Sequence, residues 1–586
     1  MELPRLTALI VVVFAVGYAV FFKYKNKPSI GESILSDEIS DEYDYVVVGG
    51  GFAGSVLASR LSEDANYSVL LLEAGEHFDY DQNIHIPSIA FNFLKSNNFA
   101  WNYKSETEKG IFLGLKDKRS GSSTINACMY ARGSPFDFEE WVKKYGCKGW
   151  GYNDLLPYFK KAEDIQIPRL KMSKYHGSGG PIAVSNAFSI PLANYFIKAG
   201  KERGYTESDY NGKSQTGFSR VQTNARFGVR SGTGLEYLGK RGKRTNLDIS
   251  VNSLVTKIKT EEKVATGVFF IKHGRKQFVK AKRDIIVSAG AFNSPQLLML
   301  SGIGPKTHLQ DLGIPVVQDV PVGQTFDDHI NIAISANINQ SVHLDKEKAR
   351  GLWSTIEYTL LGTGPLTSLA TAVGFLHIDK TKMGKERPDI MIILLPTTDE
   401  NTLANYNESV AEELIYPYIN TPGSTAFVSL LHPRVTGSVQ LRSTDPFDSP
   451  LLDTNHLSDK QDEDDLLAGI RMFEELISTD AMKSIGADIS INQASFCSHY
   501  KFRSDDFWRC MIRHIAHNFY HSTSTCKMGM KGDPTAVVDL DLRIKGIKNL
   551  RVCDASVFPA VTSANTNAPT IAVAEKFADM LKKERY

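Results

Sequence analysis

The sequence has few cysteines, almost no net charge and no internal repeat. Six cysteines are scattered over 586 residues without a CxxC pair, which argues against a structural zinc site and a small disulfide-stapled fold. Lys plus Arg number 67 and Asp plus Glu 66, a formal charge of +1, so we expect no nucleic-acid partner. Only Cys497 and Cys510 are close enough in sequence to suggest a local disulfide, and the sequence leaves that pairing open.

The composition is that of an ordinary globular protein. Hydrophobic residues make up 42% of the chain and charged residues 23%, which excludes a wholly disordered or fibrous protein. At roughly 100–200 residues per domain, the chain is too long for one compact unit. We therefore expect at least two domains.

The N-terminus carries the only strongly apolar run. Residues 6–22 contain no charge, with Arg5 before them and Lys23 after them. The run is at the lower limit for a membrane-spanning helix, about 17–25 residues, and is long enough for a signal peptide. We expect residues 1–22 to be a signal peptide cleaved after Ala19, with an uncleaved membrane anchor as the alternative. A buried core helix is disfavoured because nothing amphipathic flanks the run.

The segment after this run predicts a solvated linker over residues 23–42, because it contains Pro, Gly, Ser and Asp. Three glycosylation sequons begin at Asn66, Asn339 and Asn407. Such sequons are typical of a secreted glycoprotein, although short motifs also arise by chance. We therefore expect a secreted or extracellular protein, or one anchored in the secretory pathway.

Two kinds of secondary-structure pattern follow. Apolar runs succeeded by helical spacing recur at 44–73 and 284–300, which predicts an α/β fold. The stretch 331–430 lacks this alternation and contains short strand-like runs such as 390–395. A separate, partly antiparallel sheet is the better prediction there.

A dinucleotide site is predicted at the start of the fold. An apolar strand at 43–48 runs into Gly49, Gly51 and Gly54, and a second buried strand ends at Glu73. Gly49 permits a tight turn, Gly51 lets the backbone approach a pyrophosphate, and Gly54 allows close packing of helix on strand. The helix N-terminus offers free N–H groups to phosphates. A carboxylate 19 residues after Gly54 suits a ribose hydroxyl.

Five ordered segments make the chain resemble the glucose–methanol–choline (GMC) oxidoreductases, flavoproteins that oxidise alcohols using FAD. They are the glycine unit at 43–54, the first-signature stretch 121–133, the second signature 290–304, the histidine segment 520–529 and the C-terminal segment 554–570. The similarity spans 43–583. The sequence, including its N-terminal apolar segment, most resembles the animal extracellular members of the family that are similar to glucose dehydrogenase.

The resemblance implies a Rossmann-type FAD-binding domain interleaved with an α+β substrate domain built on an antiparallel sheet. Residues 43–330 would form mainly the FAD-binding domain, with a part near 191–229 belonging to the substrate domain. Residues 331–535 would form the substrate domain. Residues 536–586 would return to the FAD-binding domain.

Motif position also implies which residues hold the cofactor. Those for the ADP half are Gly49, Gly51, Gly54 and Glu73, with Val255 offering backbone to the adenine; those for the flavin half are Asn126, Asp554 and Asn567. No metal site is expected.

The catalytic residues implied by the resemblance are His521, as general base, and Asn565, at a partner position where members carry His or Asn. An imidazole can accept the hydroxyl proton of a small organic alcohol near neutral pH, while hydride goes to the flavin. Oxygen or another acceptor would reoxidise the cofactor. His517 and His514, in a helix-like stretch, are expected to be packed or solvated.

The chain also departs from the family's usual motifs. Arg119 and Ser120 replace Leu-Gly in the first signature, residues 522–524 replace Pro-Val-Gly after the histidine, and Ala564 replaces Gly before Asn565. These changes leave two alternatives open: a hydroxynitrile-lyase-like FAD enzyme and a secreted flavoprotein without turnover. The pair His521 and Asn565 favours an oxidoreductase, because a binding protein has no need of it.

Overall fold

The computed structural model describes residues 30–584 apart from short gaps, which are 37, 80, 96–98, 102, 107–110, 114–124, 346, 348, 350, 399–405, 420 and 493. The expected signal peptide or anchor and the departure at Arg119 and Ser120 lie outside the described residues. Among the residues that are described, no helix is both long and apolar enough to cross a membrane.

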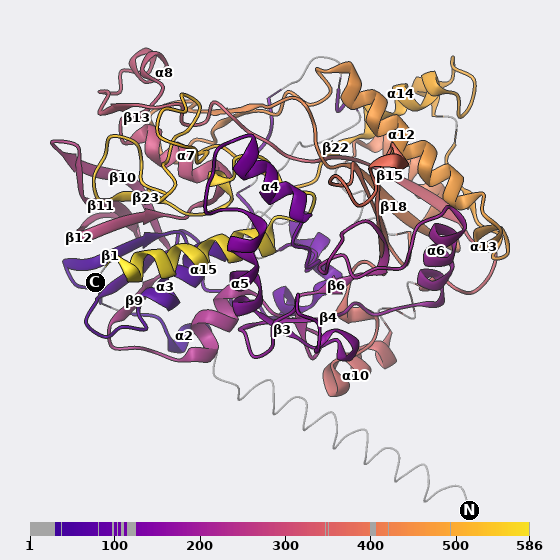
Figure 1. Ribbon diagram of the computed structural model, residues 1–586, viewed down its shortest axis with the longest axis horizontal. Helices are drawn as coiled ribbons and strands as arrows, with labels where there is room; N and C mark the ends of the chain where they lie inside the picture. The colour runs from indigo at the N-terminus through magenta and orange to yellow at the C-terminus, as the bar shows by residue number, and fades with distance from the viewer. Residues whose placement is uncertain are drawn as a thin grey trace, which may run out of the picture.

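A seven-stranded sheet forms the first half of the molecule (Figure 1). Its strands are β1 (Glu42–Val48), β2 (Val69–Leu72), β9 (Leu247–Ser250), β10 (Ser253–Glu261), β11 (Val264–Lys272), β12 (Arg275–Val287) and β23 (Leu550–Val552). The order is β10-β11-β12-β1-β2-β9, with β23 also paired to β12. The pairs among β9, β2, β1, β12 and β23 are parallel, and β10 and β11 form an antiparallel extension. Every residue of β2 is buried, as expected for a parallel strand covered on both faces.

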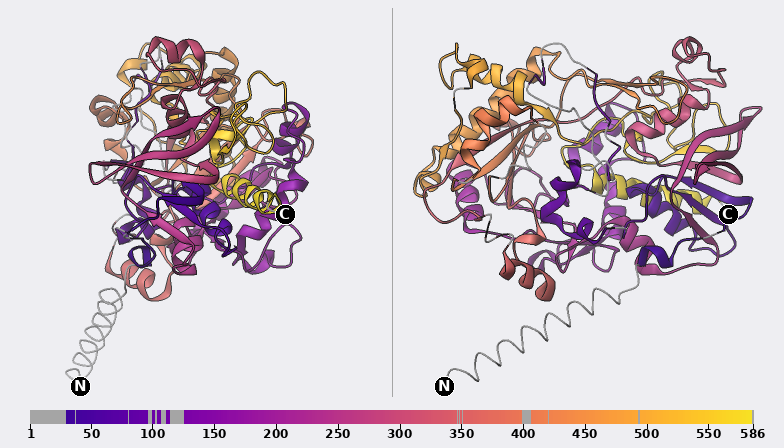
Figure 2. Two further views of the ribbon diagram at one scale, coloured as in Figure 1. Left: turned by 90° about the vertical axis from the view of Figure 1, so that its left-hand side faces the viewer. Right: turned by 180° about the vertical axis from the view of Figure 1, so that it is seen from behind.

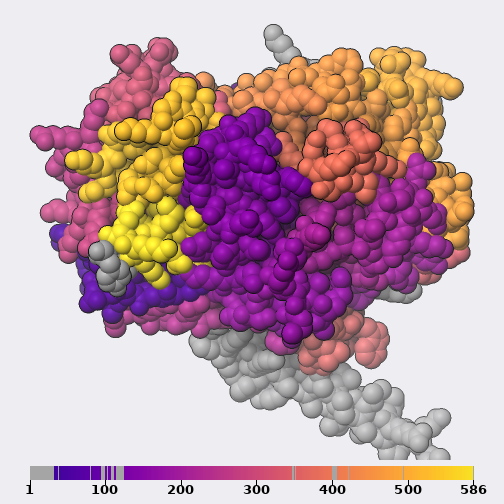
Figure 3. All heavy atoms as spheres, in the orientation of Figure 1, coloured from indigo at the N-terminus to yellow at the C-terminus, as the bar shows by residue number. Residues whose placement is uncertain are grey.

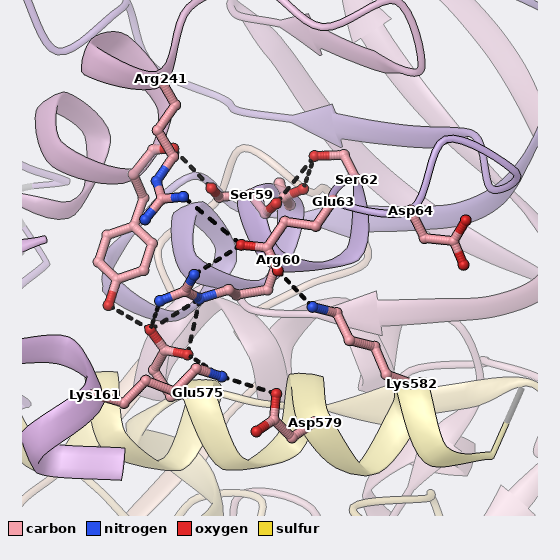
Figure 4. A network of polar contacts seen from close by, with 12 residues as sticks. Ser59, Arg60, Ser62, Glu63, Asp64, Lys161, Arg241, Glu575, Asp579 and Lys582 are labelled. Atoms are coloured by element: carbon pink, nitrogen blue, oxygen red, sulfur yellow. Dashed lines mark hydrogen bonds and ion pairs between the residues drawn. The ribbon is translucent and has the colours of Figure 1, made fainter. Parts of the chain in front are cut away.

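Two helices of this half, one near each end of the chain, are joined by a buried ion-pair network (Figure 4). α3 (Phe52–Leu61) lies alongside α15 (Asn567–Lys583). Arg60 of α3 forms an ion pair with Glu575 of α15 at 2.7 Å, and Tyr237 donates to the same carboxylate at 2.7 Å. Because a buried carboxylate is stable only when its oxygens are paired, this network holds the two helices in one register.

A second seven-stranded sheet is wholly antiparallel and forms the other half (Figure 2). Its strands are β5 (Gly217–Arg220), β15 (Ile330–Asn337), β16 (Ala372–Leu376), β17 (Ile390–Leu394), β18 (Gly423–Leu430), β21 (Asp488–Ile489) and β22 (His517–Asn518). Helices α6 (Pro191–Glu202), α12 (Lys460–Ile477) and α14 (Asp505–Ile515) pack on it. The expected antiparallel sheet is therefore present, and it includes the strand predicted at 390–395.

The remaining elements connect or cover the two sheets. The helices are α2 (Ile30–Ser33), α4 (Pro135–Lys143), α5 (Tyr152–Ala162), α7 (Gly290–Leu300), α8 (Lys306–Asp311), α10 (Leu352–Leu361), α11 (Glu408–Leu414) and α13 (Asp480–Lys483). The short strands are β3 (Glu163–Ile165), β4 (Ile182–Asn186), β6 (Gln222–Thr223), β7 (Ala225–Arg226), β8 (Val229–Arg230), β13 (Ile303–Gly304), β14 (Gln318–Asp319), β19 (Ser438–Gln440) and β20 (Leu451–Asp453).

Two expectations about local structure need correction. The expected linker is not solvated throughout, because Ile34 is buried in the first core and Ser36 hydrogen-bonds Asp248 at 2.6 Å. The helix-like stretch expected to carry His517 ends earlier, since α14 stops at Ile515 and β22 pairs with β15 instead. Tertiary pairing thus overrides the local periodicity there.

The structure shows which of four cysteines form a disulfide and which are free. Cys497 and Cys510 form a disulfide that ties the segment before α14 to that helix. Cys526 and Cys553 are free and fully buried. Burial raises the pKa of both thiols, so they act as small packing residues rather than as nucleophiles.

Candidate active site

A cavity of about 660 Å³ is lined by residues of both halves of the molecule. It begins at the glycine loop after β1, where Gly49 and Glu73 line it, and it reaches His521 and Asn565. Its volume is within the range of about 300–1,000 Å³ that is typical of ligand pockets. The cavity therefore joins the expected nucleotide site to the expected catalytic residues.

The glycine loop has a geometry that side chains would disrupt. Gly49 has φ +100°, in the region that favours glycine. A Cβ on Gly54 would lie 1.7 Å from the carbonyl oxygen of Gly49, so helix α3 can pack this closely only without a side chain there. Gly51 is the N-cap of α3 and lines the cavity, whereas Gly54 supports the loop from behind.

Glu73 holds the same loop from the end of β2. Its Oε2 accepts a hydrogen bond from Gly50 N at 2.5 Å, and its Oε1 accepts one from Gly75 N at 2.8 Å. Each carboxylate oxygen can accept a second bond. Glu73 therefore fixes the loop and keeps acceptor capacity for ribose hydroxyl groups.

The other expected cofactor residues, Asn126, Val255, Asp554 and Asn567, also line the cavity. Asp554 Oδ2 accepts hydrogen bonds from Gly290 N at 2.8 Å and from Ser294 Oγ at 2.6 Å. These bonds fix the start of α7 beside the cavity. Sequence reasoning missed Ser294, although it lies inside the second-signature segment.

His521 lies at the far end of the cavity between two polar side chains. Asn565 Nδ2 is 2.9 Å from His521 Nε2, and His329 Nδ1 is 2.8 Å from His521 Nδ1. With the amide nitrogen as donor, Nε2 carries no proton, so His521 Nδ1 carries it and donates to His329. The contacts thus leave Nε2 without a proton and accepting a hydrogen bond from Asn565, and both residues line the cavity.

Backbone bonds fix the position of His521 further. Asp328 Oδ1 accepts from the backbone N–H groups of His521 and His329, each at 2.8 Å. Tyr520 and Ser524 have φ of 61° and 74°, a left-handed conformation that costs a non-glycine residue roughly 1–2 kcal/mol. Ser524 occupies the place where the family usually has Gly, which adopts that conformation freely.

The electrostatics of this end favour neutral histidines. Burial lowers the pKa of His521 well below its ordinary value, and the neighbouring His329 lowers it further. Burial also lowers the pKa of His329 to about 3 and raises the pKa of Asp328 to about 7. A neutral imidazole can accept a proton, which suits His521 to act as a base.

The histidine expected to be packed lies elsewhere. His517, in β22, has its ring against Tyr406 and Phe427, and it does not line the cavity. Sequence reasoning missed Asp328 and His329. The available signal was an acidic pair followed by a histidine, Asp327 to His329, directly before the strand at 330.

The residues present fit FAD. The cavity is long enough to join the helix N-terminus of α3 to His521, and glycine replaces side chains where a pyrophosphate must approach. Two buried polar atoms in its wall, Ser288 Oγ and Asn565 Oδ1, have no hydrogen-bond partner within the described part of the chain. Such orphaned atoms are expected where a polar ligand belongs.

Comparison with known proteins agrees with this geometry. The two GMC oxidoreductase family models match residues 43–331 and 433–574. A glucose dehydrogenase [FAD, quinone] of Drosophila pseudoobscura pseudoobscura is 35% identical, covering 92% of this chain and 87% of its own length. The mitochondrial choline dehydrogenase of Homo sapiens is also 35% identical, with 95% and 93% covered.

Solved structures show the same fold. A pyridoxine 4-oxidase from Mesorbium loti superposes with a TM-score of 0.79 at 28% identity, covering 92% of this chain and 99% of that one. A formate oxidase superposes with a TM-score of 0.81 at 26% identity. By family models, relatives and fold, the chain belongs to the GMC oxidoreductases, and its cofactor is FAD.

Proposed function

We propose that the protein oxidises the CH–OH group of a small organic alcohol, with His521 as the general base. FAD, when bound, accepts a hydride from the alcohol carbon. The observation that carries the proposal is the contact between His521 Nε2 and Asn565 Nδ2 in the wall of a cavity that begins at a dinucleotide-binding loop.

His521 accepts the hydroxyl proton at Nε2. Nε2 carries no proton because Nδ1 keeps its own through the contact with His329. The alcohol hydroxyl must take the place of Asn565 Nδ2 as the donor to Nε2, since that nitrogen has one lone pair. The lowered pKa of His521 keeps the ring neutral at physiological pH, and a ring that is already protonated could not act as the base. After the transfer, both ring nitrogens carry a proton, and His329 still accepts the bond from Nδ1.

Asn565 assists without titrating. Its Nδ2 donates toward the place where Nε2 takes the proton, so the amide can stabilise the negative charge that develops on the alcohol oxygen. Its Oδ1 is buried and unpartnered, so it can also accept a hydrogen bond from a substrate donor. The pair thus supplies a proton acceptor and an N–H donor side by side.

We assign the remaining residues of the cavity wall to the binding of FAD. Gly49, Gly51 and the N-terminus of α3 would hold the pyrophosphate, and Glu73 the ribose. Val255 would offer backbone to the adenine. The contacts for the flavin half are Asn126, Asp554 and Asn567.

The electron acceptor is oxygen or another small molecule; the name of one relative includes quinone. A lyase or a binding protein with this fold would leave the flavin oxidised in the presence of substrate. Bleaching of the flavin absorbance by an alcohol without oxygen therefore separates an oxidoreductase from the other two functions.

The location that we propose is the secretory pathway. The apolar run at 6–22 is a routing signal or an anchor, and the disulfide between Cys497 and Cys510 is typical of an oxidising compartment. The sequon residues Asn66 and Asn339 are exposed, and a glycan can reach both. Mass spectrometry of the mature N-terminus tests this: an intact cytosolic chain that begins at Met1 and lacks glycans would contradict it.

The chemistry is tested by anaerobic stopped-flow reduction of the flavin with a panel of small alcohols. His521→Ala should slow reduction by about 10²–10⁴ while FAD stays bound, because a positioned base contributes about that factor. Asn565→Ala should slow it by loss of charge stabilisation.

The control is His517→Ala, since His517 lies outside the cavity wall and should reduce at nearly the parent rate. If His517→Ala proves as damaging as His521→Ala, or if His521→Ala reduces at the parent rate, the assignment of the base is wrong.

A further inference from the structure

A group of apolar side chains lines the histidine end of the cavity. We call these six residues the apolar wall; they are Leu369, Ala370, Ile393, Leu395, Phe427 and Phe519. Phe519 connects the wall to the base, since its ring centroid is 5.0 Å from that of His521. The ring of Phe427 is in turn 5.5 Å from that of Phe519. The apolar wall therefore adjoins the place where the reacting hydroxyl is proposed to bind.

The second sheet contributes one of its two faces to the wall. Ile393 of β17 and Phe427 of β18 are register partners, and residues directly opposite each other share a face. Ile390 and Val428 are on the other face, where both pack against Gly469 of α12. β17 is thus apolar on both faces, whereas an antiparallel sheet commonly has one polar, solvated face. The face that does not pack on helices is apolar because it lines the cavity.

The apolar wall lies in the interior of the protein. Ile393, Leu395 and Phe427 are at most 5% exposed. On the face shown in Figure 3, the purple segment that contains α4 covers the junction between the yellow C-terminal segment and the orange segment. A substrate that rests on the wall therefore leaves most of its water behind. Each polar group that it carries then needs a partner in the protein.

The charged residues that line the cavity are bonded to other parts of its wall. The acidic ones are Glu73, Glu76 and Asp554, and no Lys or Arg lines the cavity within the described part of the chain. Glu73 bonds the glycine loop, and Asp554 bonds the start of α7. Glu76 accepts a hydrogen bond from Asn252 at 2.9 Å. A charged substrate would thus lack a dedicated counter-ion beside His521.

The uncharged polar groups at this end can serve one hydroxyl group. Those that line the cavity here are Tyr520, His521, Ser522 and Asn565. Ser522 Oγ already donates to Asp328 at 2.9 Å, and Asp328 itself does not line the cavity. His521 and Asn565 supply the acceptor and the donor for a single hydroxyl. A sugar would bring several further hydroxyls onto an apolar surface, where each unpaired group weakens binding.

We propose that the substrate is a neutral alcohol with an apolar body, which packs on the apolar wall while the hydroxyl group faces His521 and Asn565. This inference rests on the alcohol oxidation proposed above and adds the class of alcohol, a branched, cyclic or aryl one. Two relatives are named for glucose and for choline. Glucose carries several hydroxyl groups and choline carries a positive charge, and the apolar wall provides hydrogen-bond partners or a counter-ion for neither.

The test compares two alcohols of the same shape. Choline and 3,3-dimethylbutan-1-ol differ only in having a cationic nitrogen or a neutral carbon at the branch point, which matters because aromatic rings such as those of Phe427 and Phe519 also attract cations. The FAD-loaded full chain is mixed with each alcohol without oxygen, and the limiting rate of flavin reduction is divided by the half-saturating concentration. The ratio should be at least about a hundredfold larger for the neutral alcohol, because a buried cation without a counter-ion is costly. Cyclohexylmethanol should likewise be preferred to glucose.

Leu369 offers a variant that should reverse the preference. It is half-buried in the bend before β16, so Leu369→Glu adds a carboxylate to the wall without replacing a residue inside a strand. The preference for 3,3-dimethylbutan-1-ol over choline should fall at least about tenfold, because the carboxylate supplies the counter-ion. Leu369→Gln removes the same apolar surface without a charge and should slow the neutral alcohol without improving choline. The matched control is Leu361→Glu, on α10 and outside the cavity wall, which should keep the parent preference.

A ligand that cannot be oxidised keeps this inference separate from the chemistry. 1-Methylcyclohexanol has an apolar ring but no hydrogen on its carbinol carbon, so calorimetry on the FAD-loaded chain measures binding alone. It should bind the parent and bind Leu369→Glu about tenfold more weakly, since that variant loses a leucine contact. Choline that reduces the flavin as well as its neutral counterpart, or 1-methylcyclohexanol that fails to bind, would overturn the substrate class. If 1-methylcyclohexanol binds but no alcohol bleaches the flavin, the apolar ligand class stands and the proposed oxidation is wrong.

Discussion

The two ends of the cavity are built in opposite ways. The glycine end comes from one continuous unit, β1 to β2, and presents mainly backbone groups. The histidine end is assembled from segments around 328, 521 and 565 and presents side-chain groups. The first can hold a cofactor through rigid geometry. In the function that we propose, the second exchanges a proton and therefore depends on protonation states. Variants at the glycine end should lose FAD, whereas variants at the histidine end should keep FAD and reduce it more slowly.

The largest effect is expected at the glycine end. Gly54→Ala places a Cβ 1.7 Å from a backbone oxygen of Gly49, which no side-chain movement can relieve. The loop and α3 must separate, so the purified variant should have lost nearly all of its FAD, measured by its absorbance.

Gly232→Ala is the matched control, because its Cβ would meet nothing nearer than Arg230 Cδ at 3.9 Å. Full FAD occupancy in Gly54→Ala would show that the close packing is not what shapes the loop.

At the histidine end, His329→Leu should leave FAD bound and slow anaerobic flavin reduction by about 10–100-fold, because a lost acceptor leaves His521 Nδ1 buried without a partner. His329 is a positioning residue, since it acts through His521. It also helps to lower the pKa of His521. In the variant, the loss of activity on acidification should therefore begin at higher pH.

His456→Leu is the control, a buried histidine whose two ring nitrogens have no hydrogen-bond partner within the described residues. His329→Gln, which keeps an acceptor, should recover part of the rate. An unchanged pH profile in His329→Leu would contradict the role of the His329 contact.

The smallest of the three effects concerns stability. Burial raises the pKa of Asp328 from 3.8 to about 7, so its contribution is fully present below pH 4 and is lost as pH rises to about 7. Asp328→Asn keeps the Oδ1 acceptor for both backbone N–H groups and places an N–H beside Ser522 Oγ. Relative to the parent, it should gain about 2 kcal/mol in free energy of unfolding between pH 5 and pH 8.

Urea unfolding at the two pH values measures that difference. Asp379→Asn is the comparison at an exposed carboxylate whose pKa is lowered, not raised. A parallel pH dependence in the parent and Asp328→Asn would mean that Asp328 is not the group responsible.

The glycine end could be predicted from sequence because its signals are local. The strand, the three glycines and Glu73 lie within 31 residues, and each acts within its own β–α–β unit. The antiparallel sheet was also predictable in outline, since strands such as β17 are short apolar runs.

The histidine end was only partly predictable, for a physical reason. His521 and Asn565 were found through motif resemblance, but His329 acts from 192 residues away. No local pattern records that contact, which exists only because β15 and β22 pair beside it. The same pairing replaced the expected helix at His517. Contacts between distant segments decide both outcomes.

The pairing of β23 with β12 has a consequence for synthesis. β12 ends at Val287 and β23 begins at Leu550, so about 260 residues separate these two paired strands. At about 5–20 residues per second, the ribosome needs roughly 13–50 s to supply the last strand. During that interval the end of β12 that pairs with β23, Ile285–Val287, lacks that partner, and α15, with Asn567 and Glu575, has not emerged. We therefore expect a chain released before α15 to retain little cofactor, because it lacks Asn567 of the cavity wall.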